Sequence, residues 1–193
     1  MAGPVNPNVR SLVIHESSYW KEPLLVAADF LEELQLSYEE SEDELARAER
    51  EILIGFYTIR KLLDTFKVSE ETKRLKFDIR SFQPIQGKQV DYFNRWEVED
   101  VFNLDRTLSE TRDLLYLCNQ FVHSYVLVFE INRSGQIEGV FVSSDRAKTR
   151  RLYFIDRQKI VGLFRRVGED YPSAQAYYRD DETGQWKVVD KET

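Results

Sequence analysis

The side chains best suited to chemistry recur along one segment, residues 105–132. Arg112, Tyr116, Asn119 and His123 are spaced by four, three and four residues, so on a helix of about 3.6 residues per turn they form a single stripe. We call these four residues the seam. A histidine with a pKa near neutrality can move a proton, and an arginine can stabilise negative charge that develops on a phosphate. The seam therefore places a proton-transfer group and a cation at one site, or forms a satisfied internal hydrogen-bond network, and the spacing alone does not name a reaction.

A helix has to position the seam, and local signals indicate where it begins. Thr107, followed three residues later by Glu110, has the form of a capping box, which predicts a motif helix over residues 105–124. Apolar residues cover most of its remaining surface: Leu114, Leu115, Leu117, Cys118, Phe121 and Val122. Because a helix that is apolar nearly all round is normally buried, we expect the seam to face a partner, a cleft or an internal polar network.

Cys118, Asn119 and His123 form the pattern Cys-Asn-x-x-x-His, and an amphipathic helix that contains residues 57–63 precedes them. This arrangement resembles the HEPN superfamily of helical proteins, whose signature is an arginine, usually an asparagine, three variable residues and a histidine. The resemblance covers at most residues 42–125. It implies a helical bundle, a homodimer paired across the motif helix, metal-free RNA cleavage by the arginine and histidine of both copies, and a place in a toxin–antitoxin or defence system.

The sequence departs from this signature at Cys118, which stands at the arginine position. Cysteine cannot supply the cation that cleavage needs, so the departure predicts a non-catalytic or weakly active HEPN-like module that engages a macromolecular partner. The alternative is an active metal-independent ribonuclease that uses His123 with Arg112 or Arg60, although Arg112 would lie about 16 Å from His123 along a helix. Asn119 and His123 could instead form a structural hydrogen-bond pair, with Cys118 as a small buried apolar residue.

A basic stretch in the back half of the chain is the second candidate site. Its proposed binding residues are Arg146, Lys148, Arg150, Arg151, Tyr153 and Arg157. Proteins use such mixtures of cations and aromatic rings on nucleic acids, so RNA is one partner to consider. The other interpretation is electrostatic pairing with residues 29–51, a segment that contains ten acidic residues and only two arginines. That pairing would lie within one molecule or between the two copies of a dimer.

A third candidate lies between these segments, in residues 82–96. This stretch holds Pro84, Gly87 and scattered aromatic residues without a clear period, which predicts a long connection folded over the core. Its aromatic content leaves a small-ligand sensor open as a further alternative function.

The hydrophobic pattern predicts an α+β protein that forms one compact unit. A helical part over residues 1–124 precedes an antiparallel β-rich part over residues 125–193 with one packed helix at about 156–168. The resemblance implies that the helical part is a HEPN-like bundle. Further elements follow from the same patterns: helices near 23–36 and 42–67, strands near 125–131, 137–143 and 152–155, and a last hairpin of 174–179 with 185–189.

Composition limits the function classes further. A net charge of −7 and a pI near 5.1 argue against a general nucleic-acid coat, because phosphate binding depends on cations. One cysteine and two histidines, at positions 118, 15 and 123, give no zinc-ligand spacing, so we expect neither a metal nor another cofactor. The sequence shows no leader pattern and no stretch of about 20 apolar residues, which predicts a cytoplasmic protein without a membrane partner.

Overall fold

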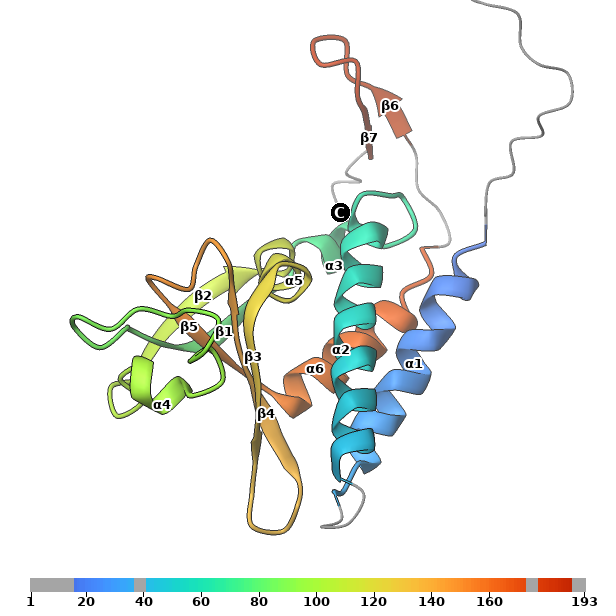
Figure 1. Cartoon of the computed structure of the whole chain (residues 1–193). Coiled ribbons are helices and arrows are strands. Elements are labelled where there is room, and N and C mark those ends of the chain that lie inside the picture. The colour runs from blue at the N-terminus through green and yellow to red at the C-terminus, as the bar shows by residue number, and fades with distance from the viewer. Residues whose placement is uncertain (1–15, 37–40, 173–176, 189–193) are drawn as a thin grey trace, which may run out of the picture.

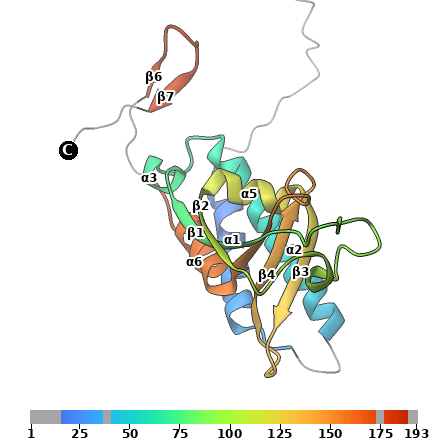
Figure 2. The ribbon, with the colours of Figure 1, turned by 90° about the vertical axis from the view of Figure 1, so that its left-hand side faces the viewer.

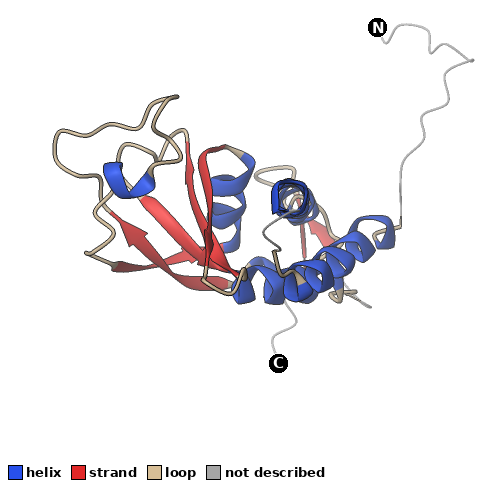
Figure 3. Cartoon of the chain, turned by 60° about the horizontal axis from the view of Figure 1, so that its bottom comes forward, coloured by secondary structure: helices blue, strands red, loops and turns tan. Residues whose placement is uncertain are grey.

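The computed structural model describes residues 16–36, 41–172 and 177–188, and it shows the α+β fold that the sequence predicts. The helices are α1 (Ser18–Glu33), α2 (Ser41–Leu63), α3 (Glu70–Lys73), α4 (Val98–Val101), α5 (Leu114–Val122) and α6 (Arg157–Gly168). The strands are β1 (Lys76–Phe82), β2 (Leu108–Asp113), β3 (Ser124–Ile131), β4 (Ile137–Ser144), β5 (Leu152–Asp156), β6 (Tyr177–Arg179) and β7 (Trp186–Val188). The long helices lie on one side of the main sheet, and the connection that contains α4 lies on the other (Figures 1 and 3).

The strongly periodic segments fold as predicted. Helices α2 and α6 and the β3–β4 hairpin occupy the expected stretches, and β5 follows as the third strand. Helix α1 begins at Ser18, about one turn before the expected start. Its first turn is closed by the backbone carbonyl oxygen of Ser17, which accepts hydrogen bonds from the backbone N–H groups of Trp20 and Lys21. In the last hairpin β6 pairs with β7, while residues 174–176 and 189 of that prediction lie outside the described part of the chain.

The predicted motif helix over residues 105–124 is wrong in its first half. β2 pairs with β1 along its whole length, from Lys76 opposite Asp113 to Ser81 opposite Leu108. Helix α5 begins only after Asp113, whose side chain accepts a hydrogen bond from the backbone N–H of Tyr116 at 2.7 Å. Residues 108–113 form a strand rather than a helix because they pair with β1, about 30 residues earlier in the chain. Their alternating exposure fits a strand at the edge of a sheet.

The main sheet joins both parts of the chain. Its five strands are antiparallel in the order β2-β1-β5-β4-β3, and Figure 2 shows the sheet with α1, α2 and α6 behind it. β1 and β2 come from the part predicted to be helical, and β1 pairs with β5 from the other part. The first part is therefore not a helical bundle throughout, and the two parts share one sheet.

The larger hydrophobic core lies between the sheet and the helices α1, α2, α5 and α6. Phe56 of α2 stacks on Phe121 of α5 with ring centroids 3.8 Å apart, and Phe164 of α6 meets Phe56 edge-on. Gly55 leaves room for the Phe164 ring, because a Cβ at position 55 would lie 2.2 Å from its Cζ atom. Helix α5 is thus held in place by aromatic contacts from the neighbouring helix.

A second, smaller core covers the opposite face of the sheet. Residues 83–107 cross this face and bury Val90, Val98, Val101 and Phe102 against the sheet residues Phe82, Phe141 and Phe154. The connection predicted over residues 82–96 is thus found, but it is longer and begins after Phe82, which belongs to β1. The connection is therefore anchored at both ends, and its outer side forms the surface of the molecule on that face of the sheet.

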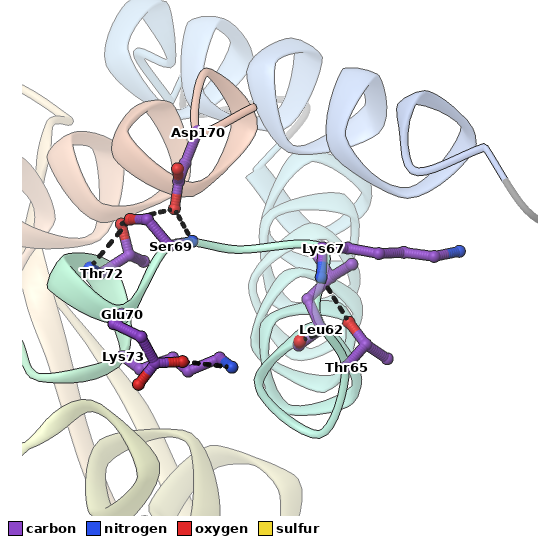
Figure 4. A network of polar contacts seen from close by, with 8 residues as sticks. All are labelled: Leu62, Thr65, Lys67, Ser69, Glu70, Thr72, Lys73 and Asp170. Carbon is purple, nitrogen blue, oxygen red and sulfur yellow. Dashed lines mark hydrogen bonds and ion pairs between the residues drawn. The ribbon is translucent and has the colours of Figure 1, made fainter. Parts of the chain in front are cut away.

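A polar junction ties α1 to the ends of α2 and α6. The Asp170 carboxylate accepts hydrogen bonds from the backbone N–H of Ser69 at 2.8 Å and from its hydroxyl at 2.9 Å (Figure 4). The buried Lys21 ammonium donates to the carbonyl oxygens of Lys67 and Asp170. Loss of hydration lowers the pKa of Lys21, while the charge of Asp170 opposes that shift. These contacts fix the helical layer on which α5 packs.

Candidate functional site

Segments that are distant in sequence meet at the end of the sheet where β4 ends and β5 begins. They form a hollow of about 750 Å³ between residues 83–88 of the connection and the turn over residues 145–151. Other side chains that line it are Arg112, Tyr116 and Tyr153. A second hollow of about 480 Å³ is lined by Tyr116, Asn119, Gln120, His123, residues 144–147 and Arg150. Because Tyr116, Ala147 and Arg150 line both, the two hollows adjoin, and we call them together the groove.

The groove brings the seam and most of the basic stretch together. Tyr116 and Asn119 project from α5, and His123 ends that helix as an exposed residue. Arg112 reaches the groove from β2 rather than from a helix, and its guanidinium lies 4.7 Å from the centroid of the Tyr116 ring. The helical stripe predicted for these four residues is therefore wrong for Arg112, which lines the larger hollow, whereas Asn119 and His123 line the smaller one and Tyr116 lines both.

The turn over residues 145–151 is compact because its backbone hydrogen bonds follow a helical pattern. The Ser144 carbonyl accepts from Ala147 and Lys148, and the Ala147 carbonyl accepts from Arg150 and Arg151. Ala147 is buried. The exposed Arg146 and Arg150 are consequently held at the mouth of the groove.

Glu110 organises two arginines on the wall of the groove. Its carboxylate accepts hydrogen bonds from the Ser81 hydroxyl at 2.6 Å, from Arg151 Nε at 2.8 Å and from Arg112. Burial opposes ionisation of Glu110, but these three donors outweigh it and hold the pKa of its carboxyl below the usual value. One carboxylate therefore faces two guanidinium groups, which leaves the wall with a net positive charge.

The floor of the groove is a pair of tyrosines. The hydroxyl oxygens of Tyr116 and Tyr153 are 2.6 Å apart, and the two rings meet edge-on. Tyr153 is buried, and the loss of hydration together with the bond to Tyr116 raises the pKa of its phenol. Tyr153, predicted as a binding residue, thus supports the groove from below, and Tyr116 is the more accessible of the two.

Three exposed cations around the groove have no ion-pair partner in the described part of the chain: Lys88, Arg146 and Arg150. Lys148 differs, because it pairs with Asp145 at 2.8 Å and its ammonium lies 3.3 Å from the centroid of the Tyr125 ring. These three cations can therefore bind an external anion without the loss of an ion pair, although Arg150 Nη2 donates a hydrogen bond to the Arg146 carbonyl oxygen at 3.1 Å.

The remaining part of the basic stretch has a different role. Arg157 donates to the carbonyl oxygens of Leu31 and Glu32 at the end of α1, away from the groove. Arg165 pairs with Asp29 and Glu32 of the same helix. Pairing with the acidic segment within one molecule is therefore found for α6, whereas Arg146 and Arg150 make no such contact.

The signature position of the HEPN resemblance lies inside the core. Cys118 is fully buried, and burial raises the pKa of its thiol to about 12, as expected of a small apolar residue. Within the described chain Asn119 and His123 are joined by a backbone hydrogen bond, from the His123 N–H to the Asn119 carbonyl oxygen at 3.3 Å, and not by their side chains; a side-chain pair across an interface stays a prediction. Arg60 of α2 forms an ion pair at 2.6 Å with Asp64, the residue that follows the helix, and does not line the groove.

Sequence reasoning did not identify several residues of the groove. Lys88 lies in an irregular connection whose path depends on the second core, and Glu110 was assigned to a capping box. Gln120 is buried, and its side-chain oxygen accepts a hydrogen bond from the backbone N–H of Ser144 at 3.0 Å, which links α5 to the end of β4. None of these roles has a local signal, because each contact joins segments far apart in the chain.

The described residues provide neither a metal-binding cluster nor a membrane-spanning helix. Within residues 16–36, 41–172 and 177–188 there is no group of three or more His, Cys, Asp or Glu residues placed to hold a metal ion. His15 lies outside these ranges. In the same part of the chain no helix is both long and apolar enough to cross a membrane.

Comparison with known proteins adds no identification. No protein family matches the chain, and no significant match is found among curated proteins or among solved structures.

Proposed function

We propose that this chain is a non-catalytic module that binds RNA through the groove. The observation that carries the proposal is the set of exposed, unpaired cations Lys88, Arg146 and Arg150 around a hollow large enough for several phosphate groups. Arg112 and Arg151 add positive charge from the wall. Guanidinium and ammonium groups in such an array are the usual partners of phosphate oxygens.

The net negative charge of the chain means that RNA can be attracted only by the cations at the groove. Since the whole chain carries a charge of −7, general attraction between the protein and a polyanion is weak or repulsive. The affinity must come from contacts made at the groove, and each of these contacts releases counterions from the RNA.

The proposal that the module is non-catalytic rests on the position of Cys118. In the HEPN resemblance this is the position of the arginine that acts on the RNA, but here the side chain points into the core and is shielded from any ligand. The relationship to HEPN proteins itself, and a role in toxin–antitoxin or defence systems, stay predictions from the sequence pattern.

A metal-independent ribonuclease is the second candidate, and one observation favours it. His123 lines the same hollow as Arg146 and Arg150, so a proton-transfer group and two cations border one space. In that case a turn arginine, rather than Arg112 or Arg60, would stabilise the charge on the phosphate.

The test compares Arg150→Gln with Arg133→Gln for binding to a labelled single-stranded RNA of about 12 nucleotides, a usual site size. Arg133 is an exposed arginine in the turn between β3 and β4, outside the groove, and serves as the charge-matched control. Each phosphate contact contributes about −0.7 to the slope of log affinity against log salt. Arg150→Gln should therefore weaken binding about fivefold at about 0.1 M salt, while Arg133→Gln leaves it unchanged.

The same samples separate the two candidates. The proposed module leaves the RNA intact after long incubation. Cleavage by the wild type in the presence of a chelator, abolished by His123→Ala with the thermal midpoint unchanged, would establish the ribonuclease instead. Equal binding by wild type, Arg150→Gln and Arg133→Gln would show that the groove is not the binding site.

A further inference from the structure

A group of exposed aromatic rings lies on the connection, beyond the groove. Tyr92, Phe93 and Trp96 are 60%, 81% and 50% exposed, and we call these three residues the aromatic patch. Tyr92 meets the Phe93 ring edge-on at 5.5 Å and the Trp96 ring at 6.1 Å between centroids. Large apolar side chains are normally buried when the fold allows it, so three adjacent exposed rings need a functional explanation.

The turn that carries the aromatic patch is well organised. The Asp91 carboxylate accepts hydrogen bonds from the backbone N–H groups of Phe93 at 2.7 Å and Asn94 at 3.2 Å. In return the Asn94 side chain accepts from the backbone N–H of Asp91 at 2.8 Å and donates to the Gln89 carbonyl at 2.9 Å. Buried Val90 and Val98 fix the two ends of the turn. The rings are therefore presented outward by a preorganised backbone, and ordering them for a ligand costs little.

Cations lie between the aromatic patch and the groove. The Arg95 guanidinium lies 5.0 Å from the ring centroid of Tyr92, 4.9 Å from that of Trp96 and 5.8 Å from that of Tyr125. The Tyr125 ring also contacts Lys148 of the turn over residues 145–151. Cation–ring contacts thus link the aromatic patch through Arg95 and Tyr125 to Lys148, which lies in the same turn as Arg146 and Arg150 of the groove.

We infer that the aromatic patch stacks the unpaired bases of a strand whose phosphates occupy the groove, so the ligand is single-stranded RNA. This inference rests on the proposed function and adds the strandedness of the ligand. Rings interleaved with cations match a polymer that alternates flat bases with charged phosphates. A base in a duplex is already stacked and paired, so it cannot use the patch without the cost of being unpaired.

The same surface is less suited to an apolar protein partner. Docking an apolar face that also covered the groove would bury Arg146 and Arg150, which have no ion-pair partner in the described chain, without a counter-charge, and this is costly. Neutralisation by phosphates removes that cost. An acidic protein segment would satisfy the cations but would leave the rings without a matching flat surface.

The experiment replaces Trp96 by alanine and uses Trp186→Ala as the matched control. Trp186 lies in β7, is 60% exposed and is remote in sequence from the patch. Three probes are compared: the single-stranded RNA of about 12 nucleotides, the same RNA annealed to its complement, and inorganic polyphosphate, which carries charge without bases. Trp96→Ala should weaken binding of the single strand about tenfold, since stacking of one base contributes about 1–3 kcal/mol. Its affinity for polyphosphate should not change, and Trp186→Ala should affect none of the three.

The outcomes separate the inference from the function on which it rests. If Trp96→Ala leaves the single-strand affinity unchanged while Arg150→Gln lowers it, or if the duplex binds as tightly as the single strand, stacking is wrong and the groove proposal stands. If the wild type binds none of the three probes, both are wrong. Tryptophan fluorescence gives a direct test of stacking on Trp96. RNA should quench the fluorescence of the wild type and of Trp186→Phe, and the quenching should be lost in Trp96→Phe.

Discussion

Cys118→Arg is expected to unfold the protein or to lower its free energy of unfolding by at least about 3 kcal/mol. Cys118 has no exposed surface and packs in the larger core between α2 and α5. A guanidinium placed there loses its hydration and is exposed to the like charge of Arg60 as well as the opposite charge of Asp113, and the longer side chain also overfills the site. Denaturant unfolding followed by circular dichroism measures the loss, with Cys118→Ala as a control that removes the thiol without adding charge.

This substitution also tests the resemblance to HEPN proteins. In an open dimer cleft, arginine at position 118 would restore the missing cation beside His123 and create RNA cleavage. A folded Cys118→Arg protein that cleaves RNA would therefore contradict the buried position of this residue and support an active-site cleft.

The second large effect concerns two glycines in helices, for which alanine is expected to act in opposite directions. Gly55→Ala should destabilise the protein by about 1–3 kcal/mol, because its Cβ would lie 2.2 Å from the Cζ atom of the packed Phe164 ring. Gly162→Ala in α6 should stabilise it by up to about 1 kcal/mol, since no atom lies within 4 Å of the added carbon and alanine has the higher helix propensity. Thermal and denaturant midpoints of the two variants measure both effects.

The comparison of the two variants controls for helix propensity. If Gly55→Ala stabilised the protein to the same extent as Gly162→Ala, α6 would not press against α2 at Phe164. The aromatic contacts that hold α5 beneath the groove would then have to be revised.

The elements that the sequence predicted correctly are those with a strong local period. Helix α2 and the β3–β4 hairpin each contain enough apolar residues at one spacing to define them without tertiary information. β2 was missed because Thr107 and Glu110 mimic a helix start, and only its pairing with β1 reveals the strand. Propensity and local motifs are weak when a distant segment offers a complete set of backbone hydrogen bonds.

The candidate site could be predicted in composition but not in geometry. The seam and the residues from Arg146 to Arg151 were each identifiable as polar or basic segments, yet nothing in the sequence shows that they meet. Their meeting depends on the hydrogen bond from the Asp145 N–H to the His123 carbonyl and on β1 lying beside β5. The aromatic patch likewise becomes a site only when the second core places its connection beside Tyr125 and Lys148.

The homodimer expected from the sequence stays a prediction, but the argument for it from the apolar surface of α5 no longer holds. It was expected because a helix that is apolar nearly all round needs cover from a partner. In the fold, Leu114, Leu117 and Phe121 of α5 are buried within one chain, and Leu115 is the one large apolar residue of this described helix that is exposed. The groove is likewise formed by residues of one chain, so RNA binding by the proposed mechanism does not require a second copy.

The central claim is that phosphate groups of a single-stranded RNA occupy the groove, and the salt dependence of binding by the wild type tests it most directly. Contacts to three phosphates, one for each of the unpaired cations Lys88, Arg146 and Arg150, predict a linear fall of log affinity against log salt with a slope of about −2. A slope indistinguishable from zero, or no binding even at about 50 mM salt, would contradict the account.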